Sequence, residues 1–364
     1  MKISVKRDNL LKGLQTASKM VKQRATLPVL GNVLLASDKG RLKIVSTDLE
    51  AAIMSWCGAK IDEEGAITVP ARTLFDYVSA ITEDTLELVS EGSDLSVKGK
   101  HGHVTIKGIS AEEFPIIPQV RTDKKIVVKA QVLKSAISSV APAAALDETR
   151  PVLAGLLFRL VGEDLMVVAT DSYRLAEKRS ELIGKNELDV IVPSRTIAEL
   201  GRILPNDESE VEISSEENQV QFKLGDIEFL SRQIDGAFPD YEQIIPKEFV
   251  HEAIVSKNSL LEAIKTANIF AREAGGNIKI AASQSGLVIS AISSQTGDSE
   301  SYVASSSKGT ALEVAFNARY ILDALNVISG EEIIFAMAGP LNPGMIFDKE
   351  DGSFRYIVMP LRNE

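Results

Sequence analysis

The feature that most constrains the fold of this 364-residue chain is a 13-residue segment that occurs three times. It spans residues 69–81, 192–204 and 316–328. Each copy leads from an apolar, strand-like run through an arginine into apolar residues at helical spacing. Successive arginines are separated by 123 and then 124 residues: Arg72, Arg195 and Arg319. Because self-similarity at a fixed period indicates repeated structural units, we predict three copies of one domain.

The segments around these copies repeat as well. Helical apolar patterns contain Leu10, Leu133 and Leu260 at corresponding positions, and short runs separated by turn residues follow them. Each copy predicts the order strand, helix, strands, helix, strands, with both helices on one face of antiparallel sheet. Proline-containing segments close the first two copies at residues 114–118 and 238–246. We therefore predict an α+β fold with three tandem domains, at residues 1–120, 126–248 and 252–364.

Composition disfavours several functional classes. Cys57 is the only cysteine, which excludes an internal disulfide framework and fits a reducing cytosol. The three histidines lack the spacing of a metal site, and we expect neither a metal nor another cofactor. No apolar run approaches the ~20 residues of a membrane-spanning helix. A strand pattern begins directly after Met1, so no signal peptide is visible and we expect a cytoplasmic protein.

Catalytic signatures are missing from the sequence. It contains no Gly-x-Ser-x-Gly, no phosphate-binding Gly-Lys-Ser/Thr loop and no His-Glu-x-x-His. Thr47-Asp48 recurs 123 residues later as Thr170-Asp171. A pair that occupies the same place in two domains is better explained as a turn or cap than as a catalytic carboxylate. We therefore predict that the chain is not an enzyme.

Charge is distributed unevenly along the chain. Residues 7–24, 71–82, 131–150, 194–205, 257–272 and 317–329, which hold the six expected helices, together carry +7. The whole chain carries −11, so the remainder carries −11 − 7 = −18. Lysines on solvated helix faces are the simpler explanation for any one helix. For all six, we favour a basic surface that contacts the phosphates of a polyanion without reading sequence, because no aromatic residues interleave with the cations.

Three further segments carry a resemblance to a known family. They are Phe-Pro-Asp-Tyr at 238–241, Ala-Thr-Asp-Ser-Tyr-Arg-Leu at 169–175 and Tyr-Ile-Val-Met-Pro-Leu-Arg at 356–362. Together with the threefold plan, they make the chain resemble the bacterial DNA polymerase III beta subunits, the sliding clamps, over residues 1–362. The resemblance implies a DNA clamp fold that closes as a head-to-tail homodimeric ring, with helices lining the hole and sheets forming the outer wall.

The resemblance also implies site residues. Basic residues expected to face DNA in the channel are Lys12, Lys19, Lys22, Arg24, Arg72, Lys134, Arg150, Arg195, Arg202, Lys257, Lys265 and Arg319. Residues expected at the dimer interface are Val104 and Ile106 on one edge and Ile269 and Phe270 on the other. The alternative for these four apolar residues is the core of their own domains, because alternating strand residues are apolar for that reason too.

A peptide-binding cleft between the second and third domains is implied as well. Its expected members are Leu153, Thr170, Tyr173, Arg174, Leu175, Pro239, Gln243, Ile244, Asn317, Tyr320, Leu341, Pro343, Ile357, Met359, Pro360, Leu361 and Arg362. An apolar cleft with a few polar groups suits a peptide, and methionine suits several partners. The alternative is that Met359 and Leu361 only complete the last strand. Ser172, Gln243 and Gly275-Gly276 depart from the family pattern and bear on partner preference.

The function implied is processivity. The clamp encircles duplex DNA and tethers the polymerase, here the DNA polymerase III alpha subunit, while a clamp loader opens the ring and other proteins with clamp-binding motifs use the same cleft. The resemblance thus implies an accessory subunit of a DNA-directed DNA polymerase, and we expect no membrane partner. The competing reading is a non-enzymatic repeat scaffold that binds proteins only.

Overall fold

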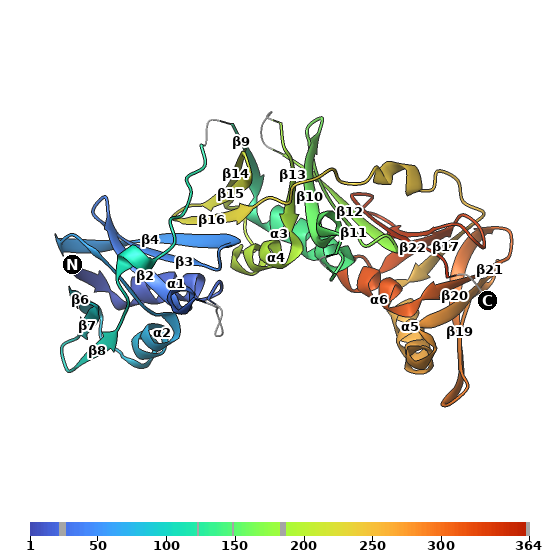
Figure 1. Ribbon diagram of the computed structural model, residues 1–364. Coiled ribbons are helices and arrows are strands. Elements are labelled where there is room, and N and C mark those ends of the chain that lie inside the picture. Colours follow the sequence, from blue (N-terminus) through green and yellow to red (C-terminus); the bar gives the residue numbers. More distant parts are fainter. Residues whose placement is uncertain (22–26, 122–123, 148, 183–186, 362–364) are drawn as a thin grey trace. The chain divides into compact units, whose positions relative to one another are not determined.

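The computed structural model describes residues 1–21, 27–121, 124–147, 149–182 and 187–361 (Figure 1). Contacts within the chain divide it into two compact units. The first unit comprises Met1–Gln131 and Arg195–Gln233, and the second comprises Val132–Leu182, Glu187–Ser194 and the chain from Ile234 onward. These units do not coincide with the three sequence repeats, because strands of the second repeat enter both sheets.

In the first unit the strands follow the order β8-β7-β6-β1-β4-β16-β15-β14-β9, and β3, β2 and β5 branch from β4. All of the pairs are antiparallel, as the repeats predict. The first repeat supplies β1 (Lys2–Lys6), β2 (Asn32–Asp38), β3 (Arg41–Thr47), β4 (Ala51–Glu63), β5 (Ala66–Pro70), β6 (Thr85–Glu91), β7 (Asp94–Lys98) and β8 (His103–Lys107). The second repeat supplies β9 (Lys125–Lys129), β14 (Glu210–Glu216), β15 (Gln219–Leu224) and β16 (Ile227–Arg232).

In the second unit the order is β13-β10-β11-β12-β24-β23-β22-β17-β20-β19-β18-β21. The second repeat supplies β10 (Gly155–Val161), β11 (Asp164–Thr170), β12 (Arg174–Glu181) and β13 (Asp189–Pro193). The third repeat supplies β17 (His251–Ser256), β18 (Asn277–Ala282), β19 (Gly286–Ser293), β20 (Gly297–Gly309), β21 (Leu312–Asn317), β22 (Glu332–Met337), β23 (Gly344–Asp348) and β24 (Phe354–Val358). Pairing of β12 with β24 therefore joins the second repeat to the third.

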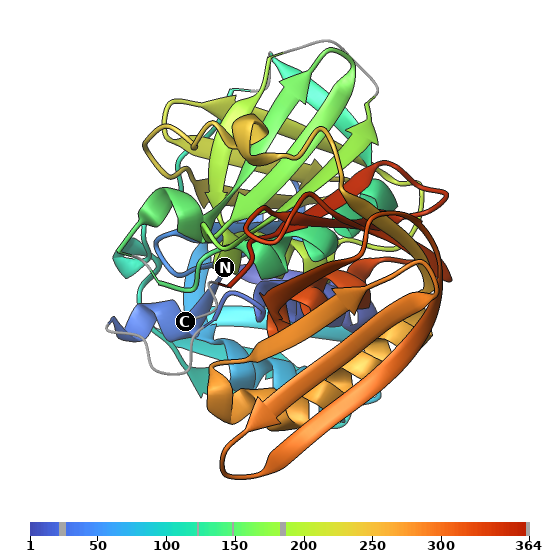
Figure 2. The same cartoon turned by 90° about the vertical axis from the view of Figure 1, so that its right-hand side faces the viewer.

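Helices cover one face of the sheets, as predicted. The helices are α1 (Arg7–Ala17), α2 (Ala71–Ala80), α3 (Ala130–Val140), α4 (Ser194–Ile203), α5 (Lys257–Ala271) and α6 (Ala318–Val327). In the first unit α1 packs on α2 and on β3 and β4. In the second unit α5 packs on α6 and on β18, β19 and β20, and Figure 2 shows these strands in orange lying over it. Leu10 and Leu260 are fully buried on the inner faces of α1 and α5, at corresponding repeat positions.

The recurring 13-residue segment forms a strand that runs directly into a helix. The strands β5, β13 and β21 end at Pro70, Pro193 and Asn317, and α2, α4 and α6 begin at the next residue. As a result, the arginine of each copy is the second residue of its helix and is exposed in all three cases: Arg72, Arg195 and Arg319.

The boundaries predicted between domains fall close to the starts of strands. β9 begins at Lys125 and β17 at His251, each one residue before the predicted start of its domain. The boundaries themselves stay predictions. Among the described residues, no helix combines the length and the apolar character that would be needed to span a membrane.

Candidate functional site

The Thr170-Asp171 pair builds the turn between β11 and β12. The hydroxyl of Thr170 donates to the carbonyl of Arg174 (2.6 Å) and accepts from the amide of Ser172 (3.1 Å). A carboxylate oxygen of Asp171 accepts from the amides of Tyr173 (2.9 Å) and Arg174 (3.0 Å). Both side chains therefore satisfy backbone groups of the turn, which confirms the prediction that this pair is a turn device.

The corresponding turn between β3 and β4 uses the same bonds. The hydroxyl of Thr47 donates to the carbonyl of Ala51 (2.7 Å) and accepts from the amide of Leu49 (3.1 Å). A carboxylate oxygen of Asp48 accepts from the amides of Glu50 (3.1 Å) and Ala51 (3.0 Å). The two turns thus share one construction at positions 123 residues apart.

Both turns require a left-handed backbone at their third residue. The φ angle is +77° at Leu49 and +79° at Ser172. This conformation costs free energy for a residue with a Cβ, whereas glycine adopts it without that penalty. The positive φ of Ser172 therefore places backbone strain in the turn that leads into β12.

Arg174 lies beneath the Thr170-Asp171 turn and holds the second and third repeats together. It is 6% exposed, and its Nε donates to the carboxylate of Asp171 (3.0 Å). One terminal nitrogen bonds the carboxylate of Asp323 and the hydroxyl of Tyr356 (3.2 Å), and the guanidinium stacks on the ring of Tyr320 at 4.5 Å. Burial raises the pKa of the Tyr356 phenol, although Arg174 lowers it. Arg174 is thus a buried residue whose Nε and one terminal nitrogen bond Asp171, Asp323 and Tyr356, and its contact with a peptide stays a prediction.

Three exposed apolar side chains belong to segments that meet near the end of β24. They are Tyr173, Leu341 and Ile244, with exposed fractions of 59%, 73% and 40%. The amide of Met359 donates to the carbonyl of Tyr173 (2.9 Å), which fixes the chain after β24 beside the turn. Apolar side chains exposed together are typical of an interaction surface.

A pocket of about 430 Å³ opens beside these side chains. Its walls are residues 243–248 together with Ala338, Asn342, Pro343 and Met359. We call this pocket, with Tyr173 and Leu341, the candidate cleft. It brings together Gln243, Ile244, Pro343 and Met359 of the predicted set. The sequence analysis missed the six other lining residues, which are Ile245, Pro246, Lys247, Glu248, Ala338 and Asn342. The signal for Asn342 is the surrounding Gly/Pro-rich turn at residues 339–343.

The closing segment that forms one wall of the candidate cleft is anchored by aromatic rings. Phe238 and Tyr241 pack edge to face, with ring centroids 6.2 Å apart and planes at 82°. Tyr241 is 4% exposed, and burial raises the pKa of its phenol above the usual value. The side-chain amide of Gln243 donates to the carboxylate of Asp240 (2.6 Å). The Phe-Pro-Asp-Tyr motif therefore fixes the segment on the sheet and leaves Ile244 at the surface.

Other predicted cleft residues lie under the surface or flank it. Leu175 and Ile357 face each other across β12 and β24 with no more than 1% exposure, so they support the candidate cleft from within. Buried in the same way are Leu153 and Thr170. Asn317 caps α6 by accepting from the amide of Arg319 (2.9 Å), and the amide of Leu361 donates to Ala315 (2.8 Å). Pro239 is exposed, Tyr320 and Pro360 are half-buried, and Arg362 lies outside the described residues.

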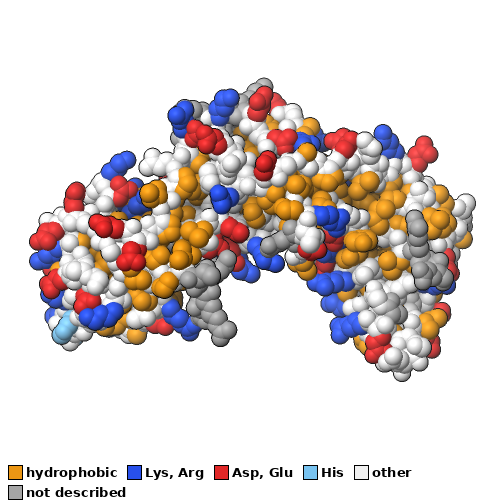
Figure 3. Space-filling view, viewed as in Figure 1, with side chains coloured by type: hydrophobic (Ala, Val, Ile, Leu, Met, Phe, Trp, Pro, Cys, Tyr) orange, Lys and Arg blue, Asp and Glu red, His pale blue; other side chains and the backbone are white. Residues whose placement is uncertain are grey.

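The basic residues predicted to face DNA fall into two groups. The first group lies exposed on helices or on the turn just after one: Lys12, Lys19, Arg72, Arg195, Arg202, Lys265 and Arg319. Lys134, also on a helix, is half-buried. The ammonium of Lys19 donates to the carbonyl of Arg202 (2.6 Å), so these two lie side by side in the first unit. Figure 3 shows blue side chains gathered over the region of α5 and α6.

Two further basic residues of the predicted set bond groups of the chain itself, and their contact with DNA stays a prediction. Lys257 donates to the carbonyl of Ile328 (2.9 Å) just after α6. Arg150 donates to the hydroxyl of Ser172 (3.0 Å), which places it against the Thr170-Asp171 turn rather than on a helix. Lys22 and Arg24 lie outside the described residues.

The four residues predicted at the dimer interface differ in exposure. Ile106 is 4% exposed and belongs to the first repeat's core cluster, and Val104 packs against the same cluster on β8, the last strand of its sheet path. For Ile106 the structure supports the core alternative. Ile269 on α5 is 62% exposed and Phe270 is half-buried, so Ile269 is available for contact.

Among the described residues no group of three or more metal-ligating side chains is present.

Comparison with known proteins matches the whole chain to one family. The N-terminal, central and C-terminal domains of the DNA polymerase III beta subunit match residues 1–118, 127–240 and 242–362. A beta sliding clamp of Staphylococcus aureus is 28% identical over 375 residues, which cover 100% of this chain and 99% of that protein.

Solved structures agree with this match. The DNA polymerase III subunit beta of Pseudomonas aeruginosa is 30% identical with a TM-score of 0.95, and the DNA polymerase sliding clamp of Bacillus subtilis is 28% identical with a TM-score of 0.95. Each alignment covers 100% of both chains. The predicted resemblance and the predicted fold class of three tandem clamp domains are thereby confirmed. The chain belongs to the DNA polymerase III beta subunit family, the sliding clamps.

Proposed function

We propose that two copies of this chain close head to tail into a ring around duplex DNA and tether replication proteins to it. The observation that carries the proposal is the match of the three clamp domains, in order, across the whole chain. A sliding clamp is a non-catalytic processivity subunit, in line with the expectation that this chain is not an enzyme. Head-to-tail contacts that close on themselves generate such rings.

Sliding requires weak contact with DNA. Arg72, Arg195 and Arg319 occupy the same exposed position at the start of a helix in each repeat. Such side chains attract phosphates without reading base sequence, and salt screens the attraction. Enclosure by the ring then retains the duplex while loose phosphate contacts let it move.

The candidate cleft supports tethering. Its exposed Tyr173 and Leu341 belong to segments beside a pocket whose walls include the apolar Ile244, Pro343 and Met359, and a short linear motif can insert there. A polymerase held in this way keeps a high effective concentration at the primer end. We propose that the DNA polymerase III alpha subunit and the clamp loader both use this cleft, and that the protein works in the bacterial cytoplasm.

Primer extension on a singly primed circular template, with the cognate polymerase and clamp loader, tests the tether. A chain that ends at Val358, and the full chain with Tyr173→Asp and Leu341→Asp, should remain dimeric by light scattering and lose the long products. Val161→Asp is the control, because Val161 is 48% exposed and lies outside the cleft. If the two cleft variants give long products as the Val161→Asp control does, the cleft assignment is refuted.

A further inference from the structure

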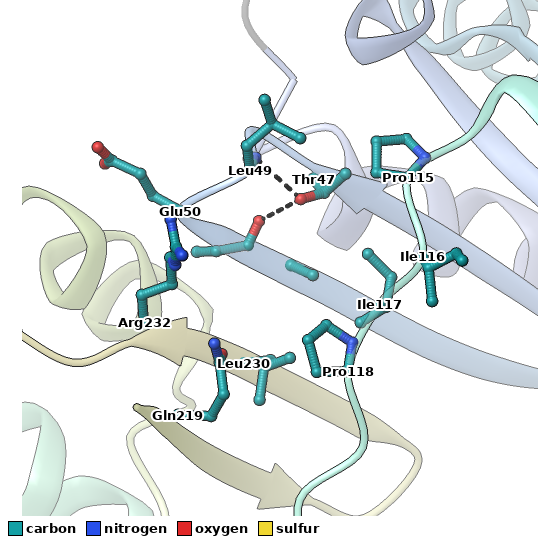
Figure 4. Close-up of a pocket in the computed structure, with 12 residues that line it drawn as sticks. Thr47, Leu49, Glu50, Pro115, Ile116, Ile117, Pro118, Gln219, Leu230 and Arg232 are labelled. Carbon is teal, nitrogen blue, oxygen red and sulfur yellow. Dashed lines mark hydrogen bonds between the residues drawn. The ribbon is translucent and has the colours of Figure 1, made fainter. Parts of the chain in front are cut away.

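A second groove lies in the first unit, where the start of β4 and the strand β16 meet the segment that closes the first repeat (Figure 4). Its volume is about 320 Å³, comparable with sites that accept small ligands or single peptide side chains. Residues 115–118 form one side, the Thr47-Asp48 turn and β4 form another, and Gln219, Leu230 and Arg232 complete it. We call it the first-unit groove.

The first-unit groove has the same sheet construction as the candidate cleft. Ala52 on β4 lies opposite Leu230 on β16. Leu175, which follows Ala52 by 123 residues, lies opposite Ile357 on β24. In both places an antiparallel pair of strands from successive repeats sets two buried apolar residues opposite each other.

The backbone at the rim repeats as well. The amide of Arg232 donates to the carbonyl of Glu50 at 2.9 Å, in the way that the amide of Met359 donates to the carbonyl of Tyr173 at 2.9 Å. The first bond continues β16 past the Thr47-Asp48 turn, and the second continues β24 past its counterpart. The position of Arg232 therefore corresponds to that of Met359.

The closing segments contribute the remaining wall. Ile116-Ile117-Pro118 in the first repeat matches Ile244-Ile245-Pro246 in the second. Ile117 packs against a buried cluster that includes Leu230, whereas Ile116 is 95% exposed. Burial of Ile116 therefore contributes almost nothing to the stability of the fold. Its side chain, at the mouth of the groove, gains the free energy of burial only when a partner covers it.

The chemistry of the first-unit groove differs from that of the candidate cleft at one end. Arg232 is exposed, and within the described part of the chain its guanidinium has no ion-pair partner. Figure 4 shows the side chain of Glu50 pointing away from the groove. Apolar walls of Leu49, Ile116 and Leu230 thus end at an uncompensated positive charge, a combination that suits an aliphatic residue next to a carboxylate.

We propose that the first-unit groove is a second docking site, which takes an extended peptide segment of a partner protein. An aliphatic side chain of the peptide lies on Ala52 and Leu230 and is covered by Ile116. A neighbouring Asp or Glu of the peptide pairs with Arg232. The proposal extends the proposed function, because the chain would then hold two partner segments per copy at separate sites.

A displayed library of random octapeptides, selected on the full chain with Tyr173→Asp and Leu341→Asp, tests this site without the candidate cleft. Both substituted residues are exposed, so the fold is expected to survive. The expected result is enrichment of peptides with Leu or Ile within two residues of Asp or Glu. Ile116→Asp should lower the affinity for a labelled selected peptide by about tenfold or more, and Arg232→Glu should lower it by a similar factor. Val161→Asp should leave its binding unchanged.

Absence of enrichment, or selected peptides that bind Ile116→Asp and Arg232→Glu as well as the parent, would overturn the second site. A parallel selection uses the chain with Ile116→Asp and Arg232→Glu, in which the candidate cleft is intact. It tests peptide binding at the candidate cleft, and thus the proposed function, on its own. Enrichment only there would support the candidate cleft and refute the first-unit groove. Enrichment only on the chain with Tyr173→Asp and Leu341→Asp would support the first-unit groove and refute the candidate cleft.

Discussion

Arg174 and Asp323 form an ion pair across 149 residues of sequence, between the second and third repeats. The side chain of Arg174 is 5% exposed and that of Asp323 is 26% exposed. Asp323 follows Arg319 on α6 as Asp76 follows Arg72 on α2, so the two aspartates occupy the same repeat position. Asp76, by contrast, pairs with Arg72 at the surface (3.6 Å, 63% exposed).

Asp323→Ala is therefore expected to destabilise the chain far more than Asp76→Ala. Removal of one partner of a buried pair leaves a desolvated charge, and with Asp171 still in place we expect a loss of about 2–3 kcal/mol. The exposed pair at Asp76 should contribute less than about 1 kcal/mol. Urea denaturation of the two variants measures both values. Equal losses would show that burial of Arg174 carries no energetic weight.

Ser172→Gly is expected to stabilise the chain by about 0.5–1 kcal/mol, because it removes the cost of a left-handed φ at a residue with a Cβ. Leu49→Gly should act in the same direction in the corresponding turn of the first repeat. Ser172→Ala is the control, since it keeps the Cβ and deletes only the hydroxyl contact with Arg150. Thermal unfolding that ranks alanine with glycine would assign the effect to the hydroxyl instead of the backbone.

The sequence predicts these turns because their determinants are local. The side chains of Thr170 and Asp171 bond backbone groups of the turn within four residues, and their recurrence as Thr47 and Asp48 reveals the pattern. The helix starts are predictable for the same reason, because a strand, a cap position and an arginine are adjacent in each repeat.

Burial of Arg174 is not predictable, because its partner Asp323 belongs to another repeat. The sequence predicts Leu175 and Ile357 as members of the cleft but does not predict that they are buried. Their mutual burial depends on the pairing of β12 with β24, which no local pattern specifies. The first-unit groove likewise combines three segments that are far apart in sequence, and it becomes visible only when the strands of two repeats are paired.

Reversal of helix charges is expected to weaken DNA contact in a salt-dependent way. Lys12→Glu and Lys265→Glu remove exposed cations from α1 and α5. Each lost phosphate contact should lower the slope of log affinity against log salt by about 0.9. Lys98→Glu, an exposed strand lysine of the first repeat, is the charge-matched control. If all three reversals lower the slope equally, then the helices have no special role.

The central claim is that the protein holds DNA by enclosure, and retention on DNA of different topology tests it most directly. The labelled chain is loaded onto nicked circular plasmid by its clamp loader, separated from free protein by gel filtration, and then treated with an enzyme that cuts the plasmid once. The account predicts that the chain stays with the circle and is released when the circle is linearised. Equal retention on linear and circular DNA, or no retention on either, would contradict it.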